Sequence, residues 1–444
     1  MLCAMSRALS GKVHMFTRAS FRTGSVGVIA AGILLLSSAN VQADKFRLWA
    51  LGGAPTGKVA DALNALESGR LAEADALFQQ AIAANPELII ATLGRAQIAI
   101  TEQRLSAADK MVSDVLQRNP NLPEAHNMRG IVLLLQKKTA ESRTEFMRAA
   151  ALNPRFVTPH LYLAAIARAA ADYPETIREY QELTKLAPRL PAGYIGKAEA
   201  QMMTGKSAEA FATLREWKVA DPKSTLPFQV IAALHMANGA PRLALEELRG
   251  AMRLDARDPV TLTALGSAHL ALGEVPAAAA QFNLALSINA SNPMARMGLA
   301  DIALRSGDLE GAKAAYRAVL KVDAQNTVAQ NNLAWILADQ GRDLEEALKL
   351  AVAATKREPE YVDGHDTLGW VHYRRAEYAR AIAAFSKAKS LAPARGDIAA
   401  HLGMAYAKVG RKQEALAELR RALSWKGELS NRREVETLIA TLAQ

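Results

Sequence analysis

The chain has 444 residues; half of them are apolar, 5% are aromatic, and the formal net charge is +10. A single cysteine excludes a fold held together by disulfides. The basic surplus is spread along the chain, without a block of Lys and Arg interleaved with aromatic residues, so the composition argues against nucleic-acid binding.

The first 43 residues resemble a secretory signal peptide. Their basic residues are Arg7, Lys12, Arg18 and Arg22, and no acidic residue occurs among them. Residues 26–36 then form an apolar stretch that is too short to span a membrane, and small residues follow up to Ala43. The resemblance implies export and a periplasmic location.

Cleavage of this signal is expected after Ala43, with Ala39 as the second choice, and would leave no membrane span. An uncleaved anchor is the alternative, and the start of translation is open between Met1 and Met15. Cys3 would be removed with the signal, so the exported chain would have no cysteine for a lipid anchor.

Residues 44–54 are predicted to form a linker, which runs into a motif with the spacing of a phosphate-binding loop. The motif is Gly52-Gly53-Ala54-Pro55-Thr56-Gly57-Lys58. Val59 stands where a phosphate-binding loop has the Ser or Thr that holds magnesium, and no α/β region follows. We interpret the motif as a Gly/Pro turn that opens a helix, and we expect no cofactor.

Residues 55–429 repeat with a period of 34 residues, eleven times. Counting positions from Pro55, position 8 is Gly or Ala in every repeat: Ala62, Ala96, Gly130, Ala164, Ala198, Ala232, Gly266, Ala300, Ala334, Gly369 and Gly403. A fixed period of this length predicts stacked helix pairs, in which each pair buries its apolar face against its neighbours.

Two further columns indicate how each helix pair is built. Aromatic residues recur in the second helix at Phe78, Phe146, Tyr180, Phe282, Tyr316 and Phe385. Glycines recur between the two helices at Gly69, Gly205, Gly239, Gly273, Gly307, Gly341 and Gly410. We expect these glycines to end the first helix in a left-handed conformation, which costs glycine little.

This pattern resembles the tetratricopeptide repeat. The resemblance implies an all-α, right-handed superhelical solenoid of helix-turn-helix units, whose first helices line a concave surface through positions 2, 5, 9 and 12. Arg95, Arg129 and Lys197 depart from the family, which usually has Leu there.

Residues 430–444 are predicted to form a C-terminal capping helix. Asn431 and Glu434 form a helix-start pattern, and apolar residues follow at helical spacing. These are Val435, Leu438, Ile439 and Leu442. Such a helix would cover the last apolar face of the array.

The sequence contains no catalytic or metal-binding signature. Six of the eight histidines fall at only two repeat positions: the fourth (His126, His160, His365) and the eleventh (His235, His269, His372). A column of this kind indicates packing or helix-face residues, and neither a zinc motif nor a nucleophile motif accompanies it. We therefore predict that the chain is not an enzyme and holds no metal.

The concave positions predict where a partner binds. The middle repeats carry apolar and methionine side chains, including Val260, while the C-terminal repeats turn polar and aromatic. The predicted partner-binding residues are Leu161, Ile195, Met202, Met236, Met294, Met297, Asn331, Trp335, Asp366, Trp370 and Tyr373. This surface suits an extended peptide or an amphipathic helix of another protein. The alternative is that these side chains pack between repeats.

The sequence around Trp335 and Trp370 resembles the C-terminal repeats of bacterial envelope proteins of exopolysaccharide export and exosortase (PEP-CTERM) systems. The resemblance implies a protein-binding scaffold in exopolysaccharide secretion or biofilm assembly. Two other functions stay open: a carbohydrate-binding solenoid, and an accessory subunit of an envelope synthase or transferase. Self-association is also open.

Overall fold

A computed structural model describes residues 56–427 and 429–444, and α-helix is the only regular structure in these residues apart from turns. The predicted signal peptide, the linker and the first half of the glycine-rich motif lie outside them. Among the described residues, no helix is both long enough and apolar enough to cross a membrane.

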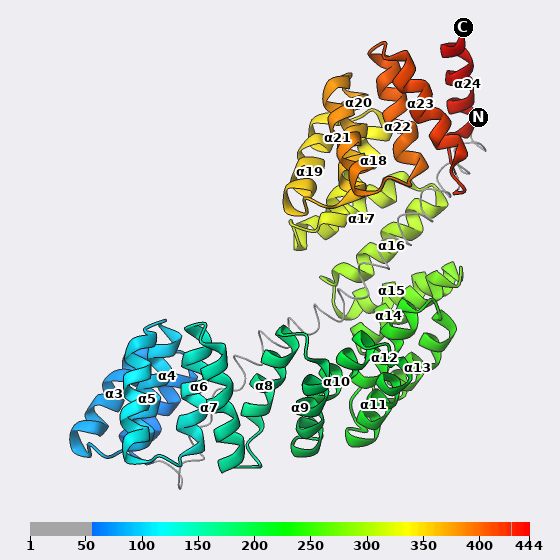
Figure 1. Ribbon diagram of the computed structural model, residues 1–444. Helices are drawn as coiled ribbons and strands as arrows, with labels where there is room; N and C mark the ends of the chain where they lie inside the picture. The colour runs from blue at the N-terminus through cyan, green and yellow to red at the C-terminus, as the bar shows by residue number, and fades with distance from the viewer. Residues whose placement is uncertain (1–55, 428) are drawn as a thin grey trace. The chain divides into compact units, whose positions relative to one another are not determined.

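The described chain divides into two compact units, residues 56–231 and 232–444, with the boundary inside α12 (Leu226–Ala237). The other helices of the first unit are α2 (Lys58–Glu67), α3 (Leu71–Ala84), α4 (Ile89–Thr101), α5 (Leu105–Arg118), α6 (Pro123–Leu135), α7 (Thr139–Leu152), α8 (Val157–Ala169), α9 (Tyr173–Leu186), α10 (Pro191–Met203) and α11 (Ser207–Ala220). Figure 1 labels these helices from α3 onward.

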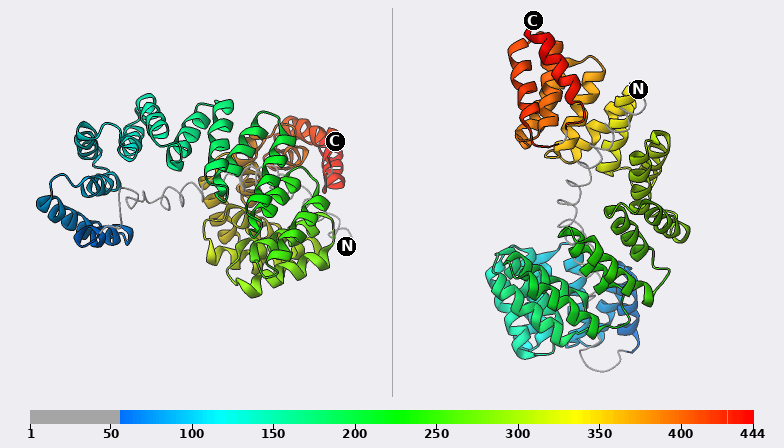
Figure 2. Two further views of the ribbon diagram at one scale, coloured as in Figure 1. Left: turned by 90° about the horizontal axis from the view of Figure 1, so that it is seen from below. Right: turned by 90° about the vertical axis from the view of Figure 1, so that its right-hand side faces the viewer.

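The second unit continues the same alternation of helices. Its helices are α13 (Pro241–Leu254), α14 (Pro259–Ala271), α15 (Val275–Ile288), α16 (Pro293–Ser306), α17 (Leu309–Val322), α18 (Thr327–Gln340), α19 (Leu344–Arg357), α20 (Val362–Arg374), α21 (Tyr378–Leu391), α22 (Gly396–Lys408), α23 (Lys412–Ser424) and α24 (Arg432–Ala443). Consecutive helices pack against each other as pairs, and Figure 2 shows these pairs from two further directions.

Each helix pair turns at a residue in the left-handed conformation, at position 15 of the repeat. The seven predicted glycines all have positive φ there. Behind Gly273, for example, the amide of Glu274 donates to the carbonyl of His269 at 2.9 Å and closes the end of α14. Four repeats make the same turn without glycine, at Gln103, Lys137, Ala171 and Ala376.

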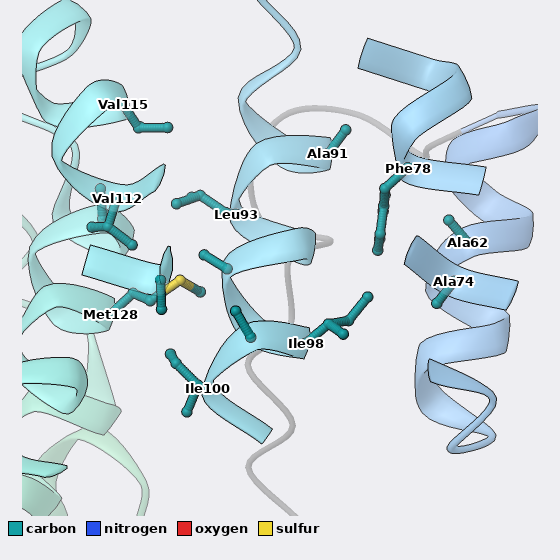
Figure 3. Close-up of a cluster of buried hydrophobic side chains, with 14 of the residues drawn as sticks. Ala62, Ala74, Phe78, Ala91, Leu93, Ile98, Ile100, Val112, Val115 and Met128 are labelled. Atoms are coloured by element: carbon teal, nitrogen blue, oxygen red, sulfur yellow. The ribbon is translucent and has the colours of Figure 1, made fainter. Parts of the chain in front are cut away.

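The aromatic column packs against small residues of the first helices. Phe282 of α15 lies between Gly266 of α14 and Gly298 of α16, and a Cβ added at Gly266 would lie 2.6 Å from the Phe282 ring. The ring therefore fills the space that the two glycines leave. Figure 3 shows the equivalent layer of the first unit, where Phe78 lies between the helices that carry Ala62 and Ala91.

The C-terminal helix α24 packs on the last repeat. Val435 is buried, and Leu438, Ile439 and Leu442 are partly buried against the same cluster, which includes Leu419 of α23. The predicted all-α class, built from helix pairs and closed by a C-terminal helix, is confirmed.

Candidate partner-binding surface

The eleven predicted partner-binding residues differ widely in exposure. We call positions 2, 5, 9 and 12 of the first helices the first-helix face. Met294 is exposed; Leu161, Met202, Met236, Met297, Trp370 and Tyr373 are partly buried; Ile195, Asn331, Trp335 and Asp366 are buried. Leu161, Ile195 and Met202 belong to the first unit and the other eight to the second.

The most exposed apolar side chains of the first-helix face lie on α14 and α16. Val260 and Met294 are each 58% exposed. Both occupy position 2 of their repeats, and the two helices pack directly against each other. Full burial of a side chain of this size is worth about 1.5–3 kcal/mol, so two neighbouring residues of this kind offer a partner a substantial gain.

The same face of α16 also carries one carboxylate, Asp301. Met297 and Asp301 follow Met294 at i+3 and i+7, the spacing that places side chains on one face of a helix. Asp301 accepts a hydrogen bond from the Tyr316 hydroxyl of α17 at 3.2 Å. Burial raises the pKa of Asp301 to about 6, against the opposing effects of this hydrogen bond and of the positive charge of Arg305.

Asp301 is the end of a chain of hydrogen bonds that runs into α18. The Asn332 side-chain amide donates to the Tyr316 hydroxyl at 3.1 Å, and Asn331 donates to the Oδ1 atom of Asn332 at 3.2 Å. The chain joins α16, α17 and α18 of repeats 8 and 9 through polar groups. A buried network of this kind fixes how the helices fit together, because breaking any link leaves a polar group unsatisfied.

On α18, two of the predicted residues of the first-helix face are buried. Asn331 is completely buried and Trp335 is 7% exposed. The cause is that α18 packs directly against α20, and Trp335 belongs to one buried cluster with Val371 of that helix. In this arrangement both residues are packing residues between repeats, and no sugar ring can stack on Trp335.

A polar and aromatic cluster joins α20 to α22. Asp366 and the Nδ1 atom of His401 are 2.8 Å apart, and His401 is 3% exposed. The Trp370 ring lies 5.1 Å from the His401 ring and stacks on Tyr373 at 5.2 Å between centroids. Of the predicted residues, the structure thus brings together Asp366, Trp370 and Tyr373.

An arginine neutralises two further carboxylates beside this cluster. Arg395 donates to Asp397 from two nitrogens, at 2.6 and 3.1 Å, and to Asp363 at 2.5 Å. Burial raises the pKa of Asp363, and Arg395 opposes the rise. The three residues form a compact ion pair network at the α20–α22 boundary, which leaves Trp370 and Tyr373 as the accessible part of the cluster.

Comparison with known proteins agrees with this repeat architecture. Family models described as tetratricopeptide repeat match residues 65–131, 231–293, 297–359, 342–397 and 397–428. Together these matches cover more than half of the chain. The chain belongs to the tetratricopeptide repeat family. No curated protein sequence matches it.

The chain is also similar to several solved structures. Cut9, in the crystal structure of an APC/C hetero-tetramer with Hcn1, is 10% identical, with a TM-score of 0.50, covering 86% of this chain and 95% of its own. Yeast Tom70 is 12% identical with a TM-score of 0.41, over 87% and 95%. A tetratricopeptide repeat protein from Parabacteroides merdae is 16% identical with a TM-score of 0.41, over 56% and 98%.

Four of the six histidines in these two columns of this tetratricopeptide repeat protein have a carboxylate partner within their own repeat. At position 4, His126 lies 2.6 Å from Glu145 and His160 lies 2.7 Å from Glu179. At position 11, the same relation holds across the turn between helices, with His269 2.6 Å from Glu274 and His372 2.7 Å from Glu377. These pairs tie one helix to its neighbour or to the turn. Within the described residues, no cluster of His, Cys, Asp and Glu could hold a metal ion.

Sequence reasoning did not single out Asp301, Arg395 or His401. A signal for His401 exists at position 6, which faces the aromatic column of the preceding second helix. Gly196 and Gly298 leave room there for an aromatic ring, whereas Tyr162 stacks its own ring on Phe146. His401 is a second ring at this position and lies 5.5 Å from the Phe385 ring.

Asp301 and Arg395 have no comparable signal, because neither residue type recurs at its position of the repeat. Their partners became evident only in the structure: Tyr316 for Asp301, and Asp363 and Asp397 for Arg395.

Proposed function

We propose that this tetratricopeptide repeat protein is a non-catalytic scaffold that binds another protein through the first-helix face of α14 and α16. The observation that carries the proposal is the pair Val260 and Met294, exposed at the same position of two adjoining repeats. Exposed apolar groups on a regular, rigid array are a typical feature of a protein-binding surface.

The chemistry of this face suits a protein partner. Methionine adapts its shape to the side chains that cover it, and Met297 lies one turn beyond Met294. Cut9, which is similar in fold, crystallised in a hetero-tetramer with Hcn1. The proposed partner contributes an extended peptide or an amphipathic helix, the two forms that place apolar side chains at a regular spacing.

The proposed setting of the scaffold is the cell envelope. Support comes from the signal-like residues 1–43 and from the resemblance of the repeats around Trp335 and Trp370 to envelope proteins of exopolysaccharide export. Sequencing the N-terminus of the purified protein tests the first part: a chain that begins at Asp44 supports export, and an intact N-terminus contradicts cleavage.

Site-specific photo-crosslinking tests the scaffold. A photoreactive amino acid is placed at Met294 in the full chain, and a matched variant carries it at Leu284, a 44% exposed residue of the second helix α15. After irradiation in the source cells, adducts are separated and identified by mass spectrometry. We expect a discrete adduct with one protein from position 294 and none from position 284.

Two results would contradict the proposal. Position 294 could give no adduct, or both positions could give the same set of adducts, which would indicate nonspecific contact. Equal helical content of the two variants by circular dichroism is the control for folding.

A further inference from the structure

The first-helix face of α14, α16 and α18 carries a single charged side chain. Its twelve positions are Val260, Thr263, Ser267, Leu270, Met294, Met297, Asp301, Leu304, Val328, Asn331, Trp335 and Ala338. Asp301 is partly buried, and its one hydrogen bond comes from the Tyr316 hydroxyl. A carboxylate has room for further donors.

The groups around Asp301 do not neutralise it. On its own helix, the positive charge of Arg305 lowers the pKa of Asp301, but by less than burial raises it. On α17 the facing group is Tyr316, whose own pKa is raised by burial and then by the charge of Asp301. The facing residues of α18, Asn331 and Asn332, are uncharged.

A partner that covers Val260 and Met294 also removes water from Asp301, which lies four positions beyond Met297 on the same face of α16. Removing solvent from an unpaired carboxylate is costly, and the cost is offset when the incoming surface brings a cation with good geometry. An apolar partner without a cation would instead favour the protonated carboxyl. The two kinds of partner therefore predict opposite responses to pH.

We infer that this face binds a basic amphipathic segment of a partner protein, whose apolar side chains cover Val260, Met294 and Met297 and whose Lys or Arg pairs with Asp301. The inference rests on the proposed scaffold function and specifies its ligand. Asp301 determines the specificity, because it is the only charge that an incoming segment meets on this face.

Peptide display on the purified full chain tests this inference. A random library of 14-residue peptides is selected at pH 7.5 against the protein, with counter-selection against Met294→Glu. We expect the enriched peptides to combine apolar residues at helical spacing with at least one Lys or Arg. Enrichment of acidic or uncharged peptides, or no enrichment at all, overturns the inference.

The sign of the pH dependence provides a second, independent readout. For an enriched peptide, the affinity is measured by titration calorimetry between pH 7 and pH 5. The ionised fraction of Asp301 falls as the pH drops through its pKa of about 6. We therefore expect the affinity to fall roughly tenfold between pH 7 and pH 5. An affinity that rises as the pH falls shows that the peptide prefers the protonated carboxyl, and overturns the inference.

Two matched variants assign the effect to this carboxyl. In Asp301→Asn, which keeps an acceptor for the Tyr316 hydroxyl, we expect loss of the preference for basic peptides and loss of the pH dependence. Glu310→Gln removes an exposed carboxylate of α17 that pairs with Lys313 at 2.7 Å, and should leave both unchanged. If the two variants behave alike, Asp301 has no special role.

The result is distinguishable from failure of the scaffold itself. A protein crosslinked at Met294 whose contact segment is acidic leaves the scaffold in place and overturns only the basic ligand. If Met294→Glu changes the mass of the unliganded protein in sedimentation, the face binds a second copy of this chain, which also overturns the inference.

Discussion

Repeats 8 and 9 present the same three positions of their first helices in opposite ways. In α16, Met294 is exposed, and Met297 and Asp301 are partly buried. In α18, the corresponding Val328 is partly buried, and Asn331 and Trp335 are buried. The register is identical, so the position within the repeat does not determine whether a side chain reaches solvent.

The difference arises from the neighbouring first helix. α18 packs directly against α20, and the large Trp335 ring occupies the layer between them with Val371. A bulky aromatic residue at position 9 therefore has two outcomes in such an array: it stays accessible, or it recruits the next helix and becomes core. Trp370, at the same position of repeat 10, is only partly buried.

Truncating Trp335 should have the largest effect on this comparison. Trp335→Ala removes a buried ring and leaves a cavity, so we expect a loss of about 3–5 kcal/mol in the free energy of unfolding. Met294→Ala removes an exposed side chain and should change it by less than about 0.5 kcal/mol. Urea unfolding followed by far-UV circular dichroism measures both, without relying on tryptophan fluorescence.

Similar stabilities for the two variants would contradict the burial of Trp335 and restore it as an accessible partner-binding residue. Repeating the experiment with Trp370→Ala places the second tryptophan on the same scale. Its partial burial predicts a loss between those of the other two variants.

The helix pairs could be predicted from the sequence because they depend on short-range columns. The seven turn glycines and the aromatic column act within one repeat or between two adjoining ones, and a 34-residue period exposes them directly. The accessibility of the face could not be predicted in this way. It depends on how closely two first helices approach, which is decided by the combined volume of side chains such as Trp335 and Val371.

Replacing Asp301 should increase the free energy of unfolding. The size of this increase measures how much stability the ionised carboxylate costs beside the buried helix α18. Because burial raises its pKa from 3.8 to about 6, the folded state binds a proton more tightly than the unfolded state. The carboxyl therefore costs little stability below pH 4, and the cost grows as the pH rises from about 4 to about 6 and stays constant above that range. We expect Asp301→Asn to gain about 2–3 kcal/mol at pH 7.5 and little at pH 4.

Urea unfolding of the variant and the parent protein at the two pH values measures this difference. Glu310→Gln is the control, since its carboxylate is exposed and should give no gain that grows with pH. An equal gain from Asp301→Asn at both pH values would mean that the effect is not ionisation, and would contradict the raised pKa.

The smallest expected effect concerns the turns that follow the first helices in the two regions. The exposed first helices α14 and α16 are followed by turns at Gly273 and Gly307, whereas the turn after α20 in repeat 10 has Ala376, with φ of 59°. Left-handed backbone costs a non-glycine residue about 1–2 kcal/mol, and glycine loses part of that advantage to its greater freedom when unfolded. We therefore expect Ala376→Gly to stabilise the protein by about 1 kcal/mol and Gly273→Ala to destabilise it by a similar amount.

Because a Cβ at Gly273 would meet no atom within 4 Å, the loss in Gly273→Ala would be conformational and not steric. Both turns also close with the same backbone hydrogen bond, at 2.9 Å, from the residue after the turn. If Gly273→Ala and Ala376→Gly change the urea midpoint by nearly equal and opposite amounts, the two turns have the same backbone strain. They would then differ only in whether glycine or alanine occupies the left-handed position. If Ala376→Gly leaves the stability unchanged, the packing of α20 against α21 already compensates the strain at Ala376. The stability of this helix pair would then come from its helix contacts and not from its turn.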